Sequence, residues 1–405
     1  MLVKNRIWRD ALKVIGNGNS LLSKSPSQYS RNWPTYYSKA KGCKIWDLKN
    51  REYLDFGTMG IGTNILGYSN PRVDSAVIKA IKKSNMSTLN CHEEYILANE
   101  LLKLHSGMHK VKFTRSGGEA NTLAVRLARA YTKKNKIIVC GYHGWHDWYL
   151  APNLKNKFAL KNHLKKDLKI GGVPSFFKNS SMSVNYNDLN NLEKIIKKNS
   201  DIAAIIMEVK RFEDPKEGYL KKIRELCNKK NIVLIFDECS SGFRETYGGI
   251  YKKYKVRPDI LMLGKALGNG FAINAVLGKN KIFNHCKDTF ISSTFWTERS
   301  GFVAGLATLR EMKRINSWNI ICDISLNLKK KLNNLMPYNK GEIINEGIIP
   351  FINIKFKNKN LKNKYIEKMV DKKILTSDKI YISTSHSTKH VNYFLKTFKE
   401  VIKSI

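Results

Sequence analysis

The sequence has few acidic residues and no long apolar run. Its 405 residues include 72 Lys and Arg against 33 Asp and Glu, a formal net charge of +39. No stretch approaches the roughly 18 uninterrupted apolar residues that a membrane-spanning helix needs. The start, MLVKNRIWRDALKVIGNG, lacks the apolar core and cleavage site of a secretory signal. We therefore expect a cytoplasmic protein that does not act at a membrane.

Cysteine is scarce, and the cysteines stand apart from one another. There are seven, an odd number, and no two of them form a C-x-x-C pair. This pattern indicates reduced thiols and argues against a disulfide framework or a zinc knuckle. His143, His146 and Asp147 lie close together, but no further histidine or cysteine cluster accompanies them. We predict no metal site.

The excess of basic residues has two interpretations. A sequence with this charge balance has the electrostatic character of a nucleic-acid binder. However, the lysines are spread along the chain, with the densest group at 153–169, and no nucleic-acid module or basic tail occurs. The charge is therefore attributed to solvated surfaces, and we expect no specific nucleic-acid partner. Anionic small ligands are favoured in either case.

Enough apolar residues are present, at 42%, for a packed globular protein. Short apolar runs alternate with Gly-rich or polar turns and helical patterns, which predicts an α/β fold with a mostly parallel sheet. Three parts are expected: an N-terminal arm and hairpin (1–67), a large domain (68–300) and a smaller α+β domain (301–405). The clearest strands of the large domain are 111–114, 137–140, 203–208, 232–236, 260–263 and 275–277.

The first functional motif follows the strand VKFTR. There, Ser116-Gly117-Gly118-Glu119 precede a helical face made of Ala120, Leu123, Ala124, Leu127, Ala128 and Tyr131. Ser116 and Glu119 have the spacing of a capping box, so the segment could be a helix start and nothing more. Alternatively, two glycines leave the first amides bare, and these amides with the helix dipole form an anion site for a phosphate.

An acidic residue ends a buried strand at Asp237. The run Ile-Val-Leu-Ile-Phe puts this carboxylate at the C-terminal end of the strand, where open α/β sheets bind ligands. A magnesium-binding strand of a phosphate-loop nucleotidase is the competing interpretation. It fails because no G-x-x-x-x-G-K-[ST] occurs in the chain.

A lysine ends the next apolar strand. Asp259-Ile-Leu-Met-Leu263 is followed by Gly264-Lys265, although lysine is rarely found beside buried strands. Burial and nearby positive charge lower the pKa of an amine and make it a Schiff-base nucleophile. The alternative is a lysine that begins a surface helix.

Together these three features suit pyridoxal 5'-phosphate (PLP). Its aldehyde needs a lysine, its pyridine nitrogen needs a buried carboxylate to stay protonated, and its phosphate needs amides. Lys265, Asp237 and the amides after Ser116 meet these needs in turn.

At this point the sequence resembles class III (fold type I) PLP-dependent aminotransferases, in the branch of glutamate-1-semialdehyde 2,1-aminomutase. The resemblance runs from about Ser25 to the C-terminus, and the matching stretches are FTRSGGEANTLAVRLARAYT, GYHGWHD, IIMEV, LIFDECSSGFR, PDILMLGKALGNGF and STFWTERSGFVAGLATL. It implies a large domain with a mostly parallel sheet, and a smaller C-terminal α+β domain.

The resemblance also implies roles for individual residues. Lys265 would form the Schiff base and shuttle protons, and Asp237 would pair with the pyridinium. Tyr142 would stack on the ring with His143 beside it. The phosphate would be held by Ser116, Gly117 and Gly118, and by Thr294 of the neighbouring subunit of a homodimer.

The chain departs from the family pattern at substrate-facing positions. Ser-Gly-Gly replaces Ser-Gly-Thr, which removes a hydroxyl at Gly118. The family's Glu-Pro and nearby asparagine are replaced by Glu208-Val209 and Glu213. The family's arginine after Ser25-Pro26 is absent, and Gln28 stands near its place. Trp296-Thr297-Glu298 replaces the family's Gly-Asn-Pro.

Candidate substrate residues are therefore Arg211, Glu208 and Trp296, with Arg244 and Glu298 as further possibilities. A PLP enzyme that moves an amino group between a small-molecule donor and a carbonyl acceptor is expected. It is either an aminomutase or a transaminase, for example one acting on a sugar or polysaccharide precursor. A catalytically inactive polyanion-binding protein is the remaining alternative.

Overall fold

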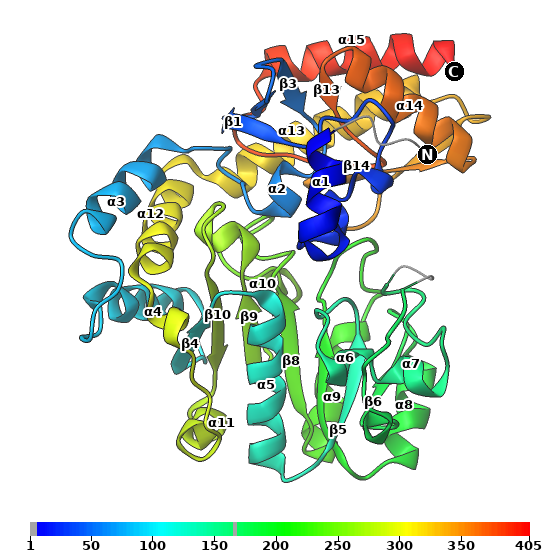
Figure 1. The fold of residues 1–405 in the computed structure, drawn as a ribbon. Helices are drawn as coiled ribbons and strands as arrows, with labels where there is room; N and C mark the ends of the chain where they lie inside the picture. The colour runs from blue at the N-terminus through cyan, green and yellow to red at the C-terminus, as the bar shows by residue number, and fades with distance from the viewer. Residues whose placement is uncertain (1–5, 165–167) are drawn as a thin grey trace. The chain divides into compact units, whose positions relative to one another are not determined.

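The computed structural model describes residues 6–164 and 168–405. The chain divides into two compact units (Figure 1): one contains Ser75–Lys313, and the other contains the chain up to Asp74 together with Arg314–Ile405. The N-terminal and C-terminal segments, expected from the sequence as separate parts, thus belong to one unit. Among the described residues no helix is long and apolar enough to cross a membrane.

A seven-stranded sheet forms the centre of the Ser75–Lys313 unit, in the order β4-β10-β9-β8-β7-β5-β6. β10 is antiparallel to β4 and β9, and the other neighbours are parallel. The predicted α/β fold with a mostly parallel sheet is confirmed. The strands are β4 (Lys110–Thr114), β5 (Lys136–Cys140), β6 (Ser181–Ser183), β7 (Ile202–Met207), β8 (Val233–Glu238), β9 (Ile260–Leu263) and β10 (Asn274–Gly278).

Helices cover this sheet, so β7 and β8 are buried along their whole length. α5 crosses one face (Figure 1) and buries Leu123, Ala124 and Leu127 there, as its apolar periodicity predicts. The helices of this unit are α4 (His92–Leu104), α5 (Gly117–Thr132), α6 (Asp147–Leu150), α7 (Pro152–Lys155), α8 (Leu189–Lys198), α9 (Tyr219–Lys230), α10 (Tyr251–Tyr254) and α11 (Asn280–Phe283). α3 (Pro71–Ile81) and α12 (Arg299–Ile315) extend past its boundaries.

Two adjacent parallel strands carry the polar residues of interest to the same sheet edge. In the register of β8 with β9, Asp237 lies opposite Met262 and Glu238 lies opposite Leu263. Lys265 follows two residues after Leu263. Because parallel strands end at the same edge, the carboxylate and the amine meet there.

The other unit contains two small sheets. β2 (Lys44–Asp47) and β3 (Glu52–Asp55) form the predicted antiparallel hairpin, which β1 (Tyr37–Lys41) and β13 (Ile374–Leu375) extend. The second sheet has the order β11-β12-β14, with bounds Gly341–Ile344, Phe351–Phe356 and Lys379–Tyr381. The helices are α1 (Arg6–Val14), α2 (Met59–Gly62), α13 (Ser317–Leu335), α14 (Lys359–Asp371) and α15 (Thr388–Ser404).

Candidate active site

The first turn of α5 combines a capping box with two uncommitted amides. Ser116 Oγ accepts a hydrogen bond from Glu119 N at 3.3 Å, and the Glu119 carboxylate accepts one from Ser116 N at 2.8 Å. The capping box that the spacing of Ser116 and Glu119 predicts is therefore present. Within the described residues, no hydrogen bond uses the amides of Gly117 and Gly118. These two donors stand at the positive end of a 16-residue helix, where an anion is stabilised.

Asp237 is buried and accepts three hydrogen bonds. His143 Nδ1 and Asn121 Nδ2 both lie 2.8 Å from Oδ2, and Cys239 N lies 3.0 Å from Oδ1. Burial alone raises the pKa of this carboxyl, but the hydrogen bonds from His143, Cys239 and Asn121 outweigh burial and leave the pKa below its ordinary value. Asp237 therefore stays a carboxylate at neutral pH.

Lys265 follows the carboxyl end of β9, and its backbone conformation is unusual. Its φ of +40° lies in the left-handed region, which is uncommon for a residue with a side chain and is concentrated at functional sites. The Nζ donates to Ser240 Oγ at 2.6 Å. Burial, together with the positive charge of Arg211, lowers the pKa of Lys265 to about 8. The preceding Gly264 has no room for a side chain, because a Cβ there would stand 1.9 Å from Asn274 Oδ1.

Tyr142, Glu208 and Arg211 lie together. Tyr142 N donates to Glu208 Oε2 at 3.1 Å, and the Arg211 guanidinium lies 5.7 Å from the Tyr142 ring centroid. Arg211 Nη1 is 3.3 Å from both Glu208 carboxylate oxygens. Beside them is a small cavity of about 70 Å³, whose lining includes Glu208, Arg211, Phe212 and Glu213.

The remaining predicted residues have other contacts or surroundings. Trp296 Nε1 donates to Glu119 Oε1 at 3.2 Å, which ties it to the α5 cap. Glu298 is paired with Arg115 at 3.3 Å. Arg244 is almost fully buried, and its Nε donates to Ser240 O at 2.6 Å. Thr294 belongs to the exposed run 292–295. Gln28 belongs to the other unit.

Sequence reasoning missed two residues of the site, Asn121 and Ser240. Asn121 is a polar residue on the buried face of α5, next to Ala120, and an amide among apolar neighbours was a usable signal. Ser240 follows the acidic strand end and becomes relevant only through its contact with Lys265 Nζ. No sequence pattern indicated that contact.

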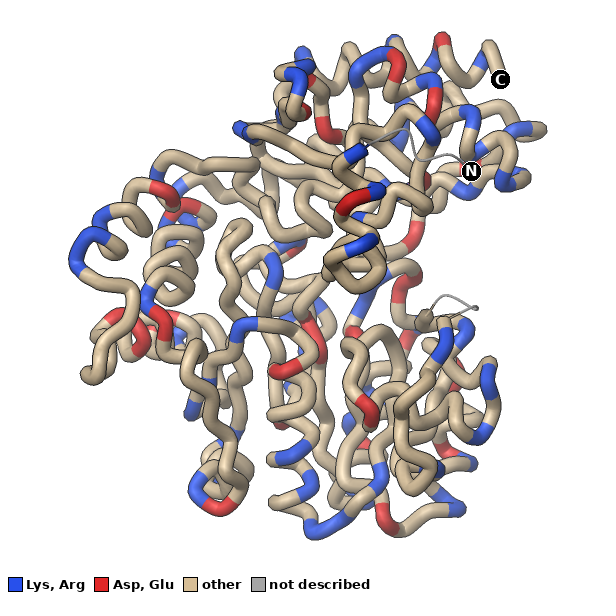
Figure 2. The backbone as a smooth tube through the Cα atoms, viewed as in Figure 1, with Lys and Arg blue, Asp and Glu red and all other residues tan. Residues whose placement is uncertain are grey.

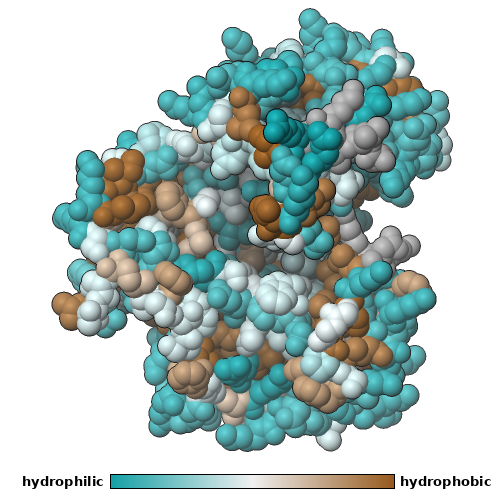
Figure 3. Space-filling view, viewed as in Figure 1, coloured by the Kyte–Doolittle hydropathy of each residue, from teal (hydrophilic) through white to brown (hydrophobic). Residues whose placement is uncertain are grey.

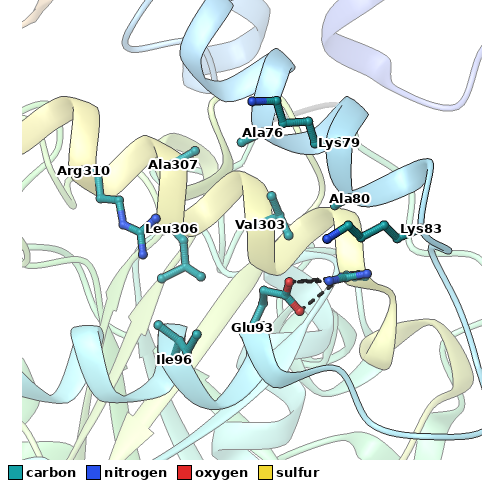
Figure 4. A pocket seen from close by; sticks show the side chains of 11 residues that line it. Ala76, Lys79, Ala80, Lys83, Glu93, Ile96, Val303, Leu306, Ala307 and Arg310 are labelled. Atoms are coloured by element: carbon teal, nitrogen blue, oxygen red, sulfur yellow. Dashed lines mark hydrogen bonds and ion pairs between the residues drawn. The ribbon is translucent and has the colours of Figure 1, made fainter.

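A larger cavity of about 320 Å³ lies between α3, α4 and α12 (Figure 4). Its floor is apolar, and Lys79, Lys83 and Arg310 line it together with Arg299, which pairs with Glu93 at 2.6 Å. None of the residues at the β8–β9 edge lines it. In the described part of the chain, no group of three or more His, Cys, Asp or Glu side chains could hold a metal ion.

The sequence model of the family described as "Aminotransferase class-III" matches residues 26–387. The chain is a class III aminotransferase. It is 32% identical over 317 residues to a 3-aminobutyryl-CoA aminotransferase of Cloacimonas acidaminovorans, covering 76% of this chain and 72% of the relative. It is 30% identical to a glutamate-1-semialdehyde 2,1-aminomutase of Sulfurisphaera tokodaii over 100% of both chains.

Solved structures share the fold. A glutamate-1-semialdehyde aminomutase of Pseudomonas aeruginosa superposes with a TM-score of 0.85, covering 98% of this chain and 93% of that one at 17% identity. The sequence-based recognition of fold type I is therefore confirmed.

Pyridoxal phosphate is the cofactor of this class III aminotransferase. The residues present fit it. The chain supplies an amine with a depressed pKa, a buried carboxylate that stays charged, and two helix-start amides with no acceptor among the described residues. Each of the three groups of the cofactor has a chemically matched partner in the Ser75–Lys313 unit.

Proposed function

We propose that this aminotransferase moves amino groups with PLP joined to Lys265, its ring nitrogen paired with Asp237 and its phosphate at Ser116, Gly117 and Gly118. When bound, the pyridinium ring withdraws electrons from the carbon that carries the amine. The observation that carries the proposal is the lysine itself: a strained backbone, a depressed pKa and a position beside a buried carboxylate.

In this proposal Lys265 acts as the proton carrier. Lys265 Nζ leaves the cofactor when the substrate amine takes its place there. With a pKa of about 8, the freed amine is partly neutral near neutral pH and accepts a proton from the substrate carbon. Ser240 Oγ, at 2.6 Å, orients that amine. Asp237 holds the proton at the ring nitrogen, because its three donors keep it negatively charged. Tyr142 supplies an aromatic surface next to the ring.

The first candidate reaction is the intramolecular amino transfer of a glutamate-1-semialdehyde 2,1-aminomutase. Relatives with that name match this chain at 30–35% identity. Arg211 supports it, because a guanidinium near Lys265 suits a substrate carboxylate.

The second candidate is a transaminase that acts on a sugar or polysaccharide precursor. It is favoured by the changed segment from Glu208 to Glu213, where Arg211 is partly neutralised by Glu208 and its guanidinium lies 4.6 Å from the Phe212 ring centroid. Phe212 is 39% exposed and offers an aromatic face to a sugar ring.

We also propose that the active unit is a homodimer in which Thr294 reaches the phosphate of the neighbouring subunit. The exposure of Thr294 and of Phe295 beside it supports an interface at this segment.

Lysine replacement tests the cofactor chemistry. The wild type with PLP is expected to show a visible absorption band that borohydride abolishes, and Lys265→Ala is expected to lack that band and to lose at least about 100-fold in turnover. Lys229→Ala, at an exposed position on α9, is the matched control and keeps both. Undiminished turnover by Lys265→Ala contradicts the proposal.

A panel of amino donors separates the two reactions. Each donor is mixed with the PLP-loaded enzyme, and conversion of the visible band to the pyridoxamine form is followed. 4,5-Diaminovalerate is expected to convert the band if the enzyme is an aminomutase. If that compound leaves the spectrum unchanged while an amino sugar converts it, the aminomutase assignment is wrong and the sugar assignment holds.

A further inference from the structure

The loop 141–147 packs onto the first turn of α5. A Cβ at Gly144 would stand 3.0 Å from Gly118 Cα, so the two backbones are in close contact. Beyond the loop, Trp148 Nε1 donates to Thr122 Oγ1 at 3.0 Å, and Thr122 Oγ1 donates to Gly118 O at 2.9 Å. The loop is therefore fixed against the same turn whose amides are uncommitted.

His146 fills the space that a side chain at position 118 would need. A Cβ at Gly118 would lie 2.7 Å from His146 Cε1 and 2.9 Å from His146 Nδ1. The Trp145 ring stacks on the imidazole, with centroids 4.7 Å apart and planes inclined by 22°, and so fixes its orientation. The imidazole and a side chain at 118 thus exclude each other.

The His146 nitrogen nearest this turn has no hydrogen-bond partner among residues 6–164 and 168–405. His146 Nδ1 is inaccessible to solvent and makes no hydrogen bond in the described part of the chain. Glu119, the nearest acidic group of the turn, is already occupied, because it accepts from Arg115 N, Ser116 N and Oγ, and Trp296 Nε1. A buried ring nitrogen without a partner costs free energy that an anion accepting from it would recover.

We propose that His146 is a cofactor-binding residue that replaces the missing side chain at position 118 and donates a hydrogen bond from Nδ1 to the cofactor phosphate. This inference rests on the proposed phosphate site at Ser116, Gly117 and Gly118. Burial lowers the pKa of His146, against the opposing charges of Glu119 and Asp147. The ring is therefore neutral at neutral pH and carries a single N–H, which we assign to Nδ1.

Equilibrium binding measures this contact without any turnover. In His146→Ala the dissociation constant of PLP is expected to rise about 10- to 100-fold, the range for a lost hydrogen bond to a charged group. The dissociation constant of pyridoxal, which lacks the phosphate, is expected to stay within twofold of the wild-type value. His146→Asn, which keeps an N–H donor, is expected to recover part of the loss. His92→Ala, an exposed histidine on α4, is the control.

A compensating pair tests the exclusion of a side chain at 118. Gly118→Thr alone is expected to weaken PLP binding, because the threonine displaces the imidazole. The double variant Gly118→Thr with His146→Ala is expected to bind PLP more tightly than either single variant, since the hydroxyl takes over the contact. Thermal unfolding establishes that each variant is folded.

The outcomes separate this inference from the proposed function. If His146→Ala binds PLP as tightly as the wild type, or loses affinity for PLP and pyridoxal equally, the role of His146 is refuted while the visible band still supports Lys265. If the wild type itself forms no band with PLP, the proposed function fails first.

Discussion

At the scale of single residues, Asp237 shows how neighbours determine the charge of a buried group. A carboxyl without partners at this depth would be neutral, whereas three donors within 3.0 Å keep it ionised. Glu238, the next residue, is also fully buried, but its pKa is raised to about 7 by burial despite the amides of Tyr251 and Ile250. Only the first of these two carboxyls is held as a permanent anion.

Asp237→Asn removes that anion while preserving shape. Turnover is expected to fall about 10- to 100-fold, because the amide cannot hold the proton at the ring nitrogen and a charge-assisted hydrogen bond is worth roughly 1.5–3 kcal/mol. The visible band of the Lys265 adduct is expected to persist. Steady-state kinetics and the spectrum check both points. Turnover within threefold of the wild type contradicts the role given to Asp237.

His386 makes the N- and C-terminal unit sensitive to acid. Its Nδ1 accepts from Ser383 N at 3.0 Å and its Nε2 donates to Asp55 O at 2.9 Å, so only the neutral ring satisfies both contacts. Burial, with a contribution from His390, lowers the pKa of His386 to about 4. A depressed histidine pKa contributes stability that is present above the unfolded pKa, near 6.5, and lost as pH falls through 4.

Urea unfolding between pH 7 and pH 4 tests this. Between pH 7 and pH 4, the free energy of unfolding of the wild type is expected to fall by about 3 kcal/mol more than that of His386→Asn. This figure follows from the pKa difference between 6.5 and about 4, at about 1.36 kcal/mol per pKa unit. Asparagine does not titrate here but can still accept from Ser383 N. Parallel pH profiles for the two proteins exclude the assignment.

At the scale of elements, α5 and α15 both begin with a capping box, but only the first turn of α5 belongs to the proposed phosphate site. In α15, Ser387 N donates to His390 Nδ1 at 3.3 Å, and in α5 Glu119 completes the box of Ser116. Ser387→Ala is expected to lower the free energy of unfolding by about 1 kcal/mol and to leave PLP affinity unchanged. Ser116→Ala is expected to cause a similar loss of stability and also to weaken PLP binding. If Ser116→Ala binds PLP normally, Ser116 is a cap only.

Strands that were strongly apolar could be predicted, and strands defined by distant partners could not. β7 and β8 were predicted within one or two residues because burial on both faces requires continuous apolar runs. β13 has only Ile374 and Leu375 and exists because it pairs with β3, more than 300 residues away. The chain after Gly301 continues in two helices, α12 and α13, and not in one, because Asn316 adopts a φ of 56° between them.

The site was predictable to the same extent and for similar reasons. Lys265 and Asp237 end apolar strands, so local sequence identifies them. Asn121 and Asp237 are separated by 116 positions in the sequence, and Ser240 and Lys265 by 25. Only the folded chain brings the members of each pair into contact. The close packing of the His146 imidazole against Gly118 likewise arises only in the folded chain, and no sequence pattern indicates it.

At the scale of the whole molecule, the basic residues are distributed along the chain. Lysine and arginine positions are spread through both units (Figure 2), and hydrophilic residues cover much of the visible face, with separate hydrophobic areas between them (Figure 3). A net charge of +39 attracts anionic small molecules and raises their association rate at low salt. It supports encounter with PLP without implying a nucleic-acid site.

The proposed exchange of Thr294 between subunits makes a prediction that only the assembled dimer can test. Suppose that Lys265→Ala chains are mixed with Thr294→Ala chains and hybrid dimers are isolated by two affinity tags. If Thr294 acts across the interface, one site of the hybrid combines an intact Lys265 with the intact threonine of the other chain. That site is expected to bind PLP with wild-type affinity.

The other site of the same hybrid carries both defects and is expected to form no band. The affinity of the Thr294→Ala homodimer for PLP is expected to be roughly 10-fold weaker because of the lost contact. At PLP concentrations that leave this homodimer mostly unloaded, the hybrid should therefore show half of the wild-type band. If Thr294 acts within its own chain, the surviving lysine of the hybrid is paired with an alanine. Its titration then coincides with that of the Thr294→Ala homodimer, and the shared site is refuted.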